Sequence, residues 1–370
     1  MLDHIVDSLV CPLTRQPLSL ISFEKSQEKY NGEVRDRTLF GLLMTPDSIA
    51  YPVIRGIPRL LQGAMSLFKE DLKGFSQQID AANVAQKSYE VDPEFEEWFL
   101  PTLESFQLEW QKHEIDGENT WGLTQADRMD RQREYMGFHD EQKFPGQIFM
   151  DAGAGTGQLT CTMAQELDTD IIGVDITSSI ERGEMLRRSI ERSGHVLFVQ
   201  ANLSMPLPFK DGLFDFIYSN GVLHHTPDTK ATYENLVPFN KVGGKFSVWL
   251  YNQGQDDMPI FPYLNMVPVK NVRPTTKNWN KSFLHTLVTI WVTLIFIFIH
   301  YPKVFITGKS SYGSRQDVIT LIYDAISPQF AYIHTPAEVT GWYEAHGYAD
   351  IFESDFRNGN GFNICGTKVA

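Results

Sequence analysis

Cysteine is scarce in this 370-residue sequence. Its three cysteines, Cys11, Cys161 and Cys365, are too few and too scattered for a disulfide framework. A chain about two domains long can also build a hydrophobic core without cross-links or a structural metal. The N-terminus has no basic region followed by an apolar run, so we expect no secretory signal. These features predict reduced thiols and a cytoplasmic protein.

Basic residues are outnumbered as well. The sequence has 32 Lys and Arg against 46 Asp and Glu, a formal net charge of −14. Such a charge repels phosphate backbones, so we expect no nucleic-acid partner and no strongly anionic substrate.

Internal repeats and low-complexity tracts are missing too, and the chain divides by pattern into five parts. Residues 1–62 have short apolar runs between turn signals, which predicts a small β-rich module. Residues 63–146 are helical in pattern, with Phe95–Gln111 as one expected helix. Residues 147–251 alternate strand-like runs with longer stretches, which indicates a parallel α/β sheet. Residues 252–335 form an insertion, and 336–370 combine a capped helix with two closing strands.

Two common phosphate-binding motifs are absent. Gly308-Lys309-Ser310 lacks the preceding glycine of a Walker loop. The run Asp151-Ala-Gly153-Ala-Gly155-Thr-Gly157 follows a predicted strand, but its third glycine comes one residue too early for a dinucleotide fingerprint. Its alternating glycines still let the backbone turn tightly and approach a ligand closely. A binder of nicotinamide dinucleotides remains the enzymatic rival, and a turn without ligand is the bland alternative.

The D-x-G-x-G-x-G run resembles motif I of class I S-adenosylmethionine-dependent methyltransferases, and Pro206–Asp228 resembles the fourth-strand region of that family. The resemblance implies a Rossmann-like sheet with helices on both faces and S-adenosyl-L-methionine as cofactor. It implies that Asp175 accepts from the ribose hydroxyls and that Asn202 accepts from the adenine amino group. The implied cofactor residues are Asp151, Gly153, Ala154, Gly155, Gly157, Asp175, Ile176, Asn202, Leu203 and Asn220.

The N-terminal part resembles the Trm112-like module that precedes many bacterial methyltransferases. Zinc-binding members carry two Cys-x-x-Cys knuckles. Here Cys11 is kept, but Thr14 takes the second position, and the other knuckle would fall near Met44 and Asp47. These side chains cannot form a tetrahedral structural zinc site. We therefore expect the fold without the metal, and Cys11 as a buried small residue.

Five residues are candidates for binding and activating the methyl acceptor. His224 and His225 follow the fourth strand, where a histidine can act as a general base; the alternative is that they pack inward and fix the loop. Tyr251 ends the fifth strand at the edge where open sheets bind ligands. Asp324 and His334 resemble acceptor-pocket residues of two-part enzymes, although each also suits a structural role. The Phe106–Trp110 helix resembles one that caps the cofactor.

The segment Phe283–Ile299 contains no Asp, Glu, Lys or Arg. We favour a helix that is buried or that lines an acceptor pocket or dimer face, and peripheral membrane contact is the alternative. A full span is disfavoured, because a helix of 17 residues is about 25 Å long and the hydrocarbon core is about 30 Å thick. A span would also place the two parts of one sheet on opposite sides of a bilayer.

The sequence therefore predicts a methyltransferase that modifies oxygen or nitrogen on a small, largely apolar acceptor, such as a secondary metabolite or lipid-like intermediate. The insertion, with Tyr263, Trp279, Trp291, Phe296, Phe298 and Tyr301, is expected to cover the acceptor. The alternatives are a non-catalytic scaffold that kept the fold, and a membrane-peripheral enzyme acting on an isoprenoid or lipid.

Overall fold

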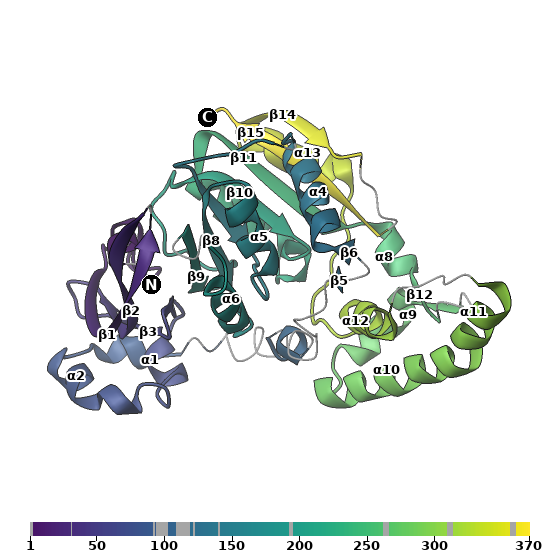
Figure 1. Cartoon of the computed structure of the whole chain (residues 1–370), viewed down its shortest axis with the longest axis horizontal. Helices are drawn as coiled ribbons and strands as arrows, with labels where there is room; N and C mark the ends of the chain where they lie inside the picture. The colour runs from purple at the N-terminus through teal and green to yellow at the C-terminus, as the bar shows by residue number, and fades with distance from the viewer. Residues whose placement is uncertain are drawn as a thin grey trace.

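A seven-stranded sheet forms the centre of the computed structural model (Figure 1). The structure describes residues 3–30, 32–91, 93, 103–108, 119–120, 123–139, 141–191, 195–261, 266–308, 314–355 and 360–370. Of the expected helix Phe95–Gln111, only 103–108 are described, and they are helical.

The strand order confirms the predicted α/β architecture. From one edge to the other it is β9 (Val196–Gln200), β8 (Asp170–Asp175), β7 (Ile148–Ala152), β10 (Phe214–Asn220), β11 (Asn240–Tyr251), β15 (Gly361–Lys368) and β14 (Tyr348–Glu353). The first five strands are parallel, and β15 is antiparallel to both of its neighbours. The order reverses between β7 and β10, and open α/β sheets bind ligands at such a switch point, beyond the carboxyl ends of the strands.

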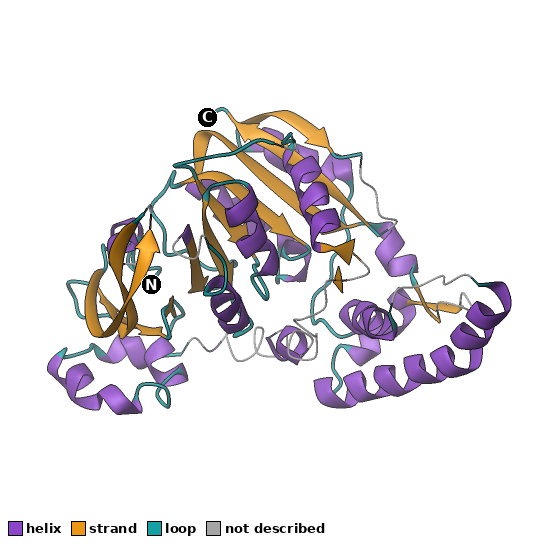
Figure 2. Cartoon of the chain, in the orientation of Figure 1, coloured by secondary structure: helices purple, strands orange, loops and turns teal. Residues whose placement is uncertain are grey.

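Helices cover both faces of this sheet (Figure 2). On β10, Ile217 packs into one hydrophobic core, while its neighbours Phe216 and Tyr218 pack into the other, because successive strand residues point to opposite faces. The helices of one face are α4 (Gln125–Met136), α5 (Gln158–Glu166) and α6 (Ile180–Arg187). Those of the other are α7 (Thr229–Leu236) and α13 (Pro336–Ala345). Thr335 and Glu338 form the predicted capping box of α13.

The first part of the chain forms an antiparallel sheet of its own. Its elements are η1 (Asp3–Ser8), β1 (Ser19–Tyr30), β2 (Glu33–Met44), β3 (Ala50–Ile54) and β4 (Ile57–Pro58). Short helices follow: α1 (Ala64–Leu67), η2 (Lys73–Phe75), α2 (Ser76–Ala81) and η3 (Gln86–Tyr89). Cys11 is fully buried, as expected, and its Sγ lies 3.2 Å from the Tyr51 hydroxyl oxygen.

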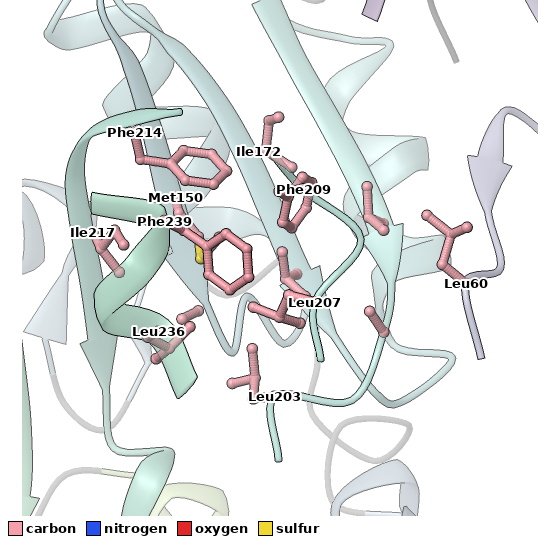
Figure 3. Packing of buried hydrophobic residues seen from close by; sticks show 14 of the residues in the cluster. Leu60, Met150, Ile172, Leu203, Leu207, Phe209, Phe214, Ile217, Leu236 and Phe239 are labelled. Atoms are coloured by element: carbon pink, nitrogen blue, oxygen red, sulfur yellow. The ribbon is translucent and has the colours of Figure 1, made fainter. Parts of the chain in front are cut away.

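This N-terminal module packs against the edge strand β9. Arg59 follows β4, forms a parallel bridge with Gln200, and donates through Nη1 to the Gln200 Oε1 at 2.7 Å. Leu60 joins the same hydrophobic core as Met150 and Ile172 of the central sheet (Figure 3).

A buried ion network also joins the module to α6. Arg37 on β2 pairs with Glu184 on α6 at 2.8 Å and with Glu28 on β1 at 3.1 Å, and Arg187 pairs with both glutamates. Because removing one partner would leave a buried charge uncompensated, this network ties the two parts together.

The insertion is built around a hydrophobic core separate from those of the sheet. Its elements are α8 (Gln253–Asp257), β12 (Pro259–Phe261), β13 (Met266–Pro268), α9 (Val269–Thr276), α10 (Lys281–Ile295), the π-helical turn η8 (Phe296–His300), α11 (Tyr301–Thr307) and α12 (Arg315–Ile326). The short strands β5 (Asn119–Thr120) and β6 (Leu123–Thr124) precede α4.

The expectation that Phe283–Ile299 is buried is wrong for half of its surface. One face of α10, including Leu284, Val288 and Val292, packs into the core of the insertion. The other face is exposed to solvent, with Ile290 53% exposed, and Phe298 in the following turn η8 is 72% exposed. The helix lies at the rim of the molecule rather than over the sheet (Figure 1), so only one side of it finds protein to pack against.

Candidate functional site

The glycine loop joins β7 to α5 and has the backbone conformation that its glycines permit. Gly153, Gly155 and Gly157 all have positive φ, of 100°, 53° and 69°. A Cβ atom on Gly153 would lie 2.2 Å from a methyl carbon of Val222, and one on Gly157 would lie 2.4 Å from the Phe198 ring. The loop therefore needs glycine both for its turn and for its packing.

Asp151 lies beneath this loop at the end of β7. Its Oδ2 accepts a hydrogen bond of 2.6 Å from the Thr160 hydroxyl of α5. Burial raises the pKa of Asp151 to about 6, although the hydrogen bond from Thr160 opposes that rise.

Asp175, the last residue of β8, contacts the glycine loop directly. Its Oδ2 accepts from the Gly155 amide at 2.8 Å, and its Oδ1 accepts from the amide and the hydroxyl of Thr177, both at 2.7 Å. Burial raises the pKa of Asp175, and these hydrogen bonds oppose that rise. The loop and the carboxylate thus form one unit.

The remaining cofactor candidates lie at the same end of the sheet. The Ala154 amide donates to the Val174 carbonyl oxygen, and the Ile176 carbonyl oxygen accepts from Gln200 Nε2. Asn202 follows β9, and its Oδ1 accepts from the Ser204 amide at 2.9 Å. Leu203 packs its side chain into the hydrophobic core.

Sequence reasoning missed the contribution of α4 to this region. Gln132 accepts through Oε1 from Asn220 Nδ2 at 2.6 Å, and Asn220 ends β10. Arg128 donates through Nη1 to Gln158 Oε1 at 2.8 Å, where α5 leaves the glycine loop. Its Nε and Nη2 are buried and have no partner among the described residues. No motif marked these residues, because α4 reads only as a polar, capped helix.

The two histidines lie in the turn η6 (Leu223–His225) after β10, and both are buried. Nδ1 of His225 lies 2.8 Å from the Phe330 carbonyl oxygen, so Nδ1 carries the proton and Nε2 carries the lone pair. Neither ring nitrogen of His224 has a partner among the described residues. Burial lowers the pKa of both histidines, so both rings are neutral near pH 7.

Tyr251, Asp324 and His334 surround this histidine pair. The Tyr251 ring lies against the His224 ring at 3.9 Å between centroids, and the Tyr251 hydroxyl donates to Asp324 Oδ2 at 2.6 Å. The His334 amide donates to the Tyr251 carbonyl oxygen at 2.9 Å. His334 Nδ1 lies 3.1 Å from a Glu338 carboxylate oxygen, and the buried Nε2 has no partner in the described chain. The structure thus brings all five acceptor candidates together.

Arg273 of α9 is a further member that sequence reasoning did not identify. Its Nη2 donates to Asp256 Oδ1 at 2.8 Å, while its buried Nη1 has no partner within the described ranges. Its charge contributes to the lowered pKa of both His224 and His225, after the larger effect of burial. The insertion therefore does supply side chains to this site, through α9 and α12.

The aromatic residues that we expected to cover the acceptor do not lie here. Trp279, Phe298 and Tyr301 are 39%, 72% and 57% exposed, and Phe296 packs into the insertion's own core. Trp291 is partly buried and packs against that core, and Tyr263 lies outside the described residues. The reason is geometric: α10 packs on α12 with one face and turns its other face to solvent.

No group of three or more His, Cys, Asp or Glu side chains in the described part of the chain is arranged to hold a metal ion.

Comparison with known proteins gives a family for the central part of the chain. Residues 150–248 match the family described as a methyltransferase domain. This range contains the glycine loop, Asp175 and both histidines. Residues 150–248 thus resemble S-adenosylmethionine-dependent methyltransferases in sequence, and their strand order agrees with that fold.

Curated relatives share this domain at low identity. The chain is 27% identical over 110 residues to phosphoethanolamine N-methyltransferase 2 of Caenorhabditis elegans, covering 30% of this chain and 25% of that protein. It is 28% identical over 105 residues to an O-methyltransferase of Pyrenophora dematioidea, covering 28% and 39%. The similarity thus spans only about a quarter to two fifths of these relatives' lengths.

Solved structures of methyltransferases also align with the chain. Geranyl diphosphate C-methyltransferase from Streptomyces coelicolor A3(2) aligns with a TM-score of 0.42 at 15% identity, covering 73% of this chain and 99% of that one. Phosphoethanolamine N-methyltransferase 2 of Haemonchus contortus aligns with a TM-score of 0.41 at 13% identity, covering 74% and 58%. The fold assignment rests on the strand order and on the family match.

The residues of this region fit S-adenosyl-L-methionine. The positive φ angles of Gly153, Gly155 and Gly157 give the tight turn at the carboxyl end of β7. Asp175 places a carboxylate beside that loop, where it can accept from two neighbouring hydroxyls.

Proposed function

We propose that the protein transfers a methyl group from S-adenosyl-L-methionine to an oxygen or nitrogen atom of a small acceptor. The observation that carries this proposal is a buried polar cluster beside the cofactor region. Both nitrogens of His224, Nε2 of His334 and Nη1 of Arg273 are buried without partners in the described chain. Buried polar groups are costly unless they form hydrogen bonds, and a bound acceptor would supply the missing partners.

The glycine loop and Asp175 would hold the cofactor at the carboxyl edge of β7 and β8. Asp175 would accept from the ribose hydroxyls, Asn202 would bind the adenine, and Asn220 would contribute from the end of β10. When bound, the cofactor supplies the methyl group and a good leaving group. The protein's task is then mostly orientation, since a well-placed acceptor needs little further activation.

His225 is the better candidate for the general base. Its Nδ1–H donates to the Phe330 carbonyl, which fixes the ring and leaves the lone pair on Nε2. The carboxylate of Asp324 favours the protonated form of this ring, which supports proton uptake. In the proposed step, His225 Nε2 would take the proton from the acceptor's O–H or N–H group. The oxygen or nitrogen would bond to the methyl carbon as the sulfur–methyl bond breaks and S-adenosylhomocysteine leaves.

The surroundings of the histidines suggest the kind of acceptor. Aromatic rings of Tyr251, Trp249 and Phe106 contact the histidine pair, while Arg273 and His334 offer hydrogen bonds. This combination suits a small molecule with an apolar body and one polar group, as in a secondary metabolite or a lipid-like intermediate.

We also propose that the N-terminal module is a Trm112-like module that has lost its zinc ligands. Its position before the central sheet and its own antiparallel sheet support this proposal. Its buried ion network with α6 would then stabilise the domain without a metal.

Calorimetric titration with S-adenosylhomocysteine tests the proposal at its first step. We expect saturable binding by the purified chain and none by Gly155→Val, checked to be folded by circular dichroism. A folded wild-type chain that gives no heat would refute the enzyme and favour the scaffold alternative. Thermal shifts with NAD against S-adenosylhomocysteine address the dinucleotide rival, because only a ligand that binds the native state raises the melting temperature.

A further inference from the structure

The continuous helix Lys281–Thr307, made of α10, η8 and α11, is apolar on two sides. By length and composition it could cross a membrane, yet only 28% of its most apolar window is buried. Leu284, Val288 and Val292 pack into the core of the insertion. The opposite side exposes Phe283, Leu287, Ile290, Leu294, Ile297, Phe298, Tyr301, Phe305 and Ile306. We call these nine residues the apolar face.

The apolar face is not that of an ordinary surface helix. Its members recur at three- and four-residue spacing, so they line one side of a rod about 40 Å long. Phe298, Phe305 and Ile306 are 72%, 92% and 80% exposed. A helix on the surface of a soluble protein normally turns charged or polar residues outward, and a contiguous exposed patch of this kind marks an interaction site.

The charge around the apolar face is opposite to that of the rest of the chain. The insertion, residues 252–335, contains seven Lys and Arg and four Asp, a formal charge of 7 − 4 = +3. The whole chain carries −14, so the remaining residues carry −14 − 3 = −17. Two of the four aspartates are paired with cations of the insertion, Asp256 with Arg273 and Asp257 with Lys270. Asp317 caps the start of α12, and Asp324 accepts from Tyr251.

Three further cations lie along this segment: Lys303 and Arg315 are exposed, and Lys277 is partly exposed. Lys281 is buried and donates to the carbonyl oxygens of Lys277 and Ser327, so it does not belong to this cationic border.

We propose that the apolar face docks the protein onto an anionic lipid bilayer surface, with the helix lying in the plane of the interface. An apolar stripe bordered by cations fits this position, since the stripe enters the headgroup region while the cations meet lipid phosphates. Trp279, just before α10, and Tyr301, at the start of α11, are exposed and are residue types favoured at that depth. A second copy of the chain fits less well, because it would bring two positively charged segments together.

Vesicle co-sedimentation with the full-length chain tests this surface without requiring activity, so the result is independent of the proposed function. We expect binding to vesicles of phosphatidylcholine and phosphatidylglycerol (3:1), and at least tenfold weaker binding to pure phosphatidylcholine or in 0.5 M salt. The variant Phe298→Glu/Phe305→Glu should lose at least tenfold in binding. The matched control Val34→Glu/Val242→Glu, at apolar residues 60% and 69% exposed elsewhere, should stay within twofold of wild type.

Three results would overturn the assignment. A wild-type chain that stays in solution with both vesicle types has no such surface. Equal vesicle binding by the Phe298→Glu/Phe305→Glu variant and by the control variant would place any membrane contact elsewhere. Vesicle binding that does not change with phosphatidylglycerol content or with salt would exclude an anionic surface. Sedimentation velocity addresses the rival occupant: a wild-type dimer that the face variant converts to monomer, without vesicle binding, would identify a second copy. Melting temperatures show that each variant is folded.

Discussion

Replacing Asp175 by alanine should weaken cofactor binding through two separate effects. The carboxylate would no longer accept from the ribose, and the Gly155 amide would lose the acceptor that holds it at 2.8 Å. A hydrogen bond to a charged group contributes about 1.5–3 kcal/mol. Since about 1.4 kcal/mol is a tenfold change, the Kd for S-adenosylhomocysteine should rise by about 10-fold to 150-fold.

Calorimetry on wild type and two variants separates these effects. Thr177→Val removes only the hydroxyl that donates to Asp175 Oδ1, so the carboxylate and its bond to Gly155 remain. This control should bind within about threefold of wild type. The Kd of Asp175→Ala is compared with that of Thr177→Val, after circular dichroism has shown that both variants are folded. If Asp175→Ala binds within twofold of wild type while folded, the carboxylate does not hold the ribose and the assignment is wrong.

Further predictions follow from burial and packing. His225→Ala should lower turnover by about 100-fold or more. It should also remove the fall in rate at acidic pH, because the base must be neutral to act and burial lowers the pKa of His225 below 6.5. An unchanged pH–rate profile would exclude His225 as the base. Asp151→Asn should stabilise the fold by about 1–3 kcal/mol at pH 7, because the buried carboxyl has a raised pKa of about 6 and is costly to ionise. That gain should shrink toward pH 4 in urea unfolding experiments, and a pH-independent gain would contradict it. Gly157→Ala should destabilise by about 2–4 kcal/mol, from positive φ and the clash with Phe198, and a thermal melt equal to wild type would refute this packing. Arg37→Met should cost about 3–5 kcal/mol in the same experiment, because Glu184 keeps fewer partners; a neutral result would show that the ion network does not hold the module.

The sequence by itself determined the core of the fold. The alternation of strand-like runs and longer stretches in residues 147–251 predicted a parallel α/β sheet, and five parallel strands lie in this range. A strand buried on both faces is apolar along its length, which makes such runs recognisable. The glycine loop was predictable because positive φ and close packing leave glycine as the unstrained choice. The helix that begins after Thr335 was also predictable from the sequence. The Thr335 and Glu338 side chains accept hydrogen bonds from each other's backbone amides, and this capping box depends only on local residue types.

Only the tertiary structure decided what surrounds the histidines and which side of Phe283–Ile299 is covered. Arg128 and Arg273 carry no local signal, and they become candidates because packing buries their donors without partners. Phe283–Ile299 was expected to be buried because its composition is apolar. Composition does not show which other elements pack against a helix. In the described part of the insertion, α12 packs against one face of α10, and the opposite face is exposed. Burial depends on which elements meet in space, and the outer face of α10 is therefore a surface that no local pattern could assign.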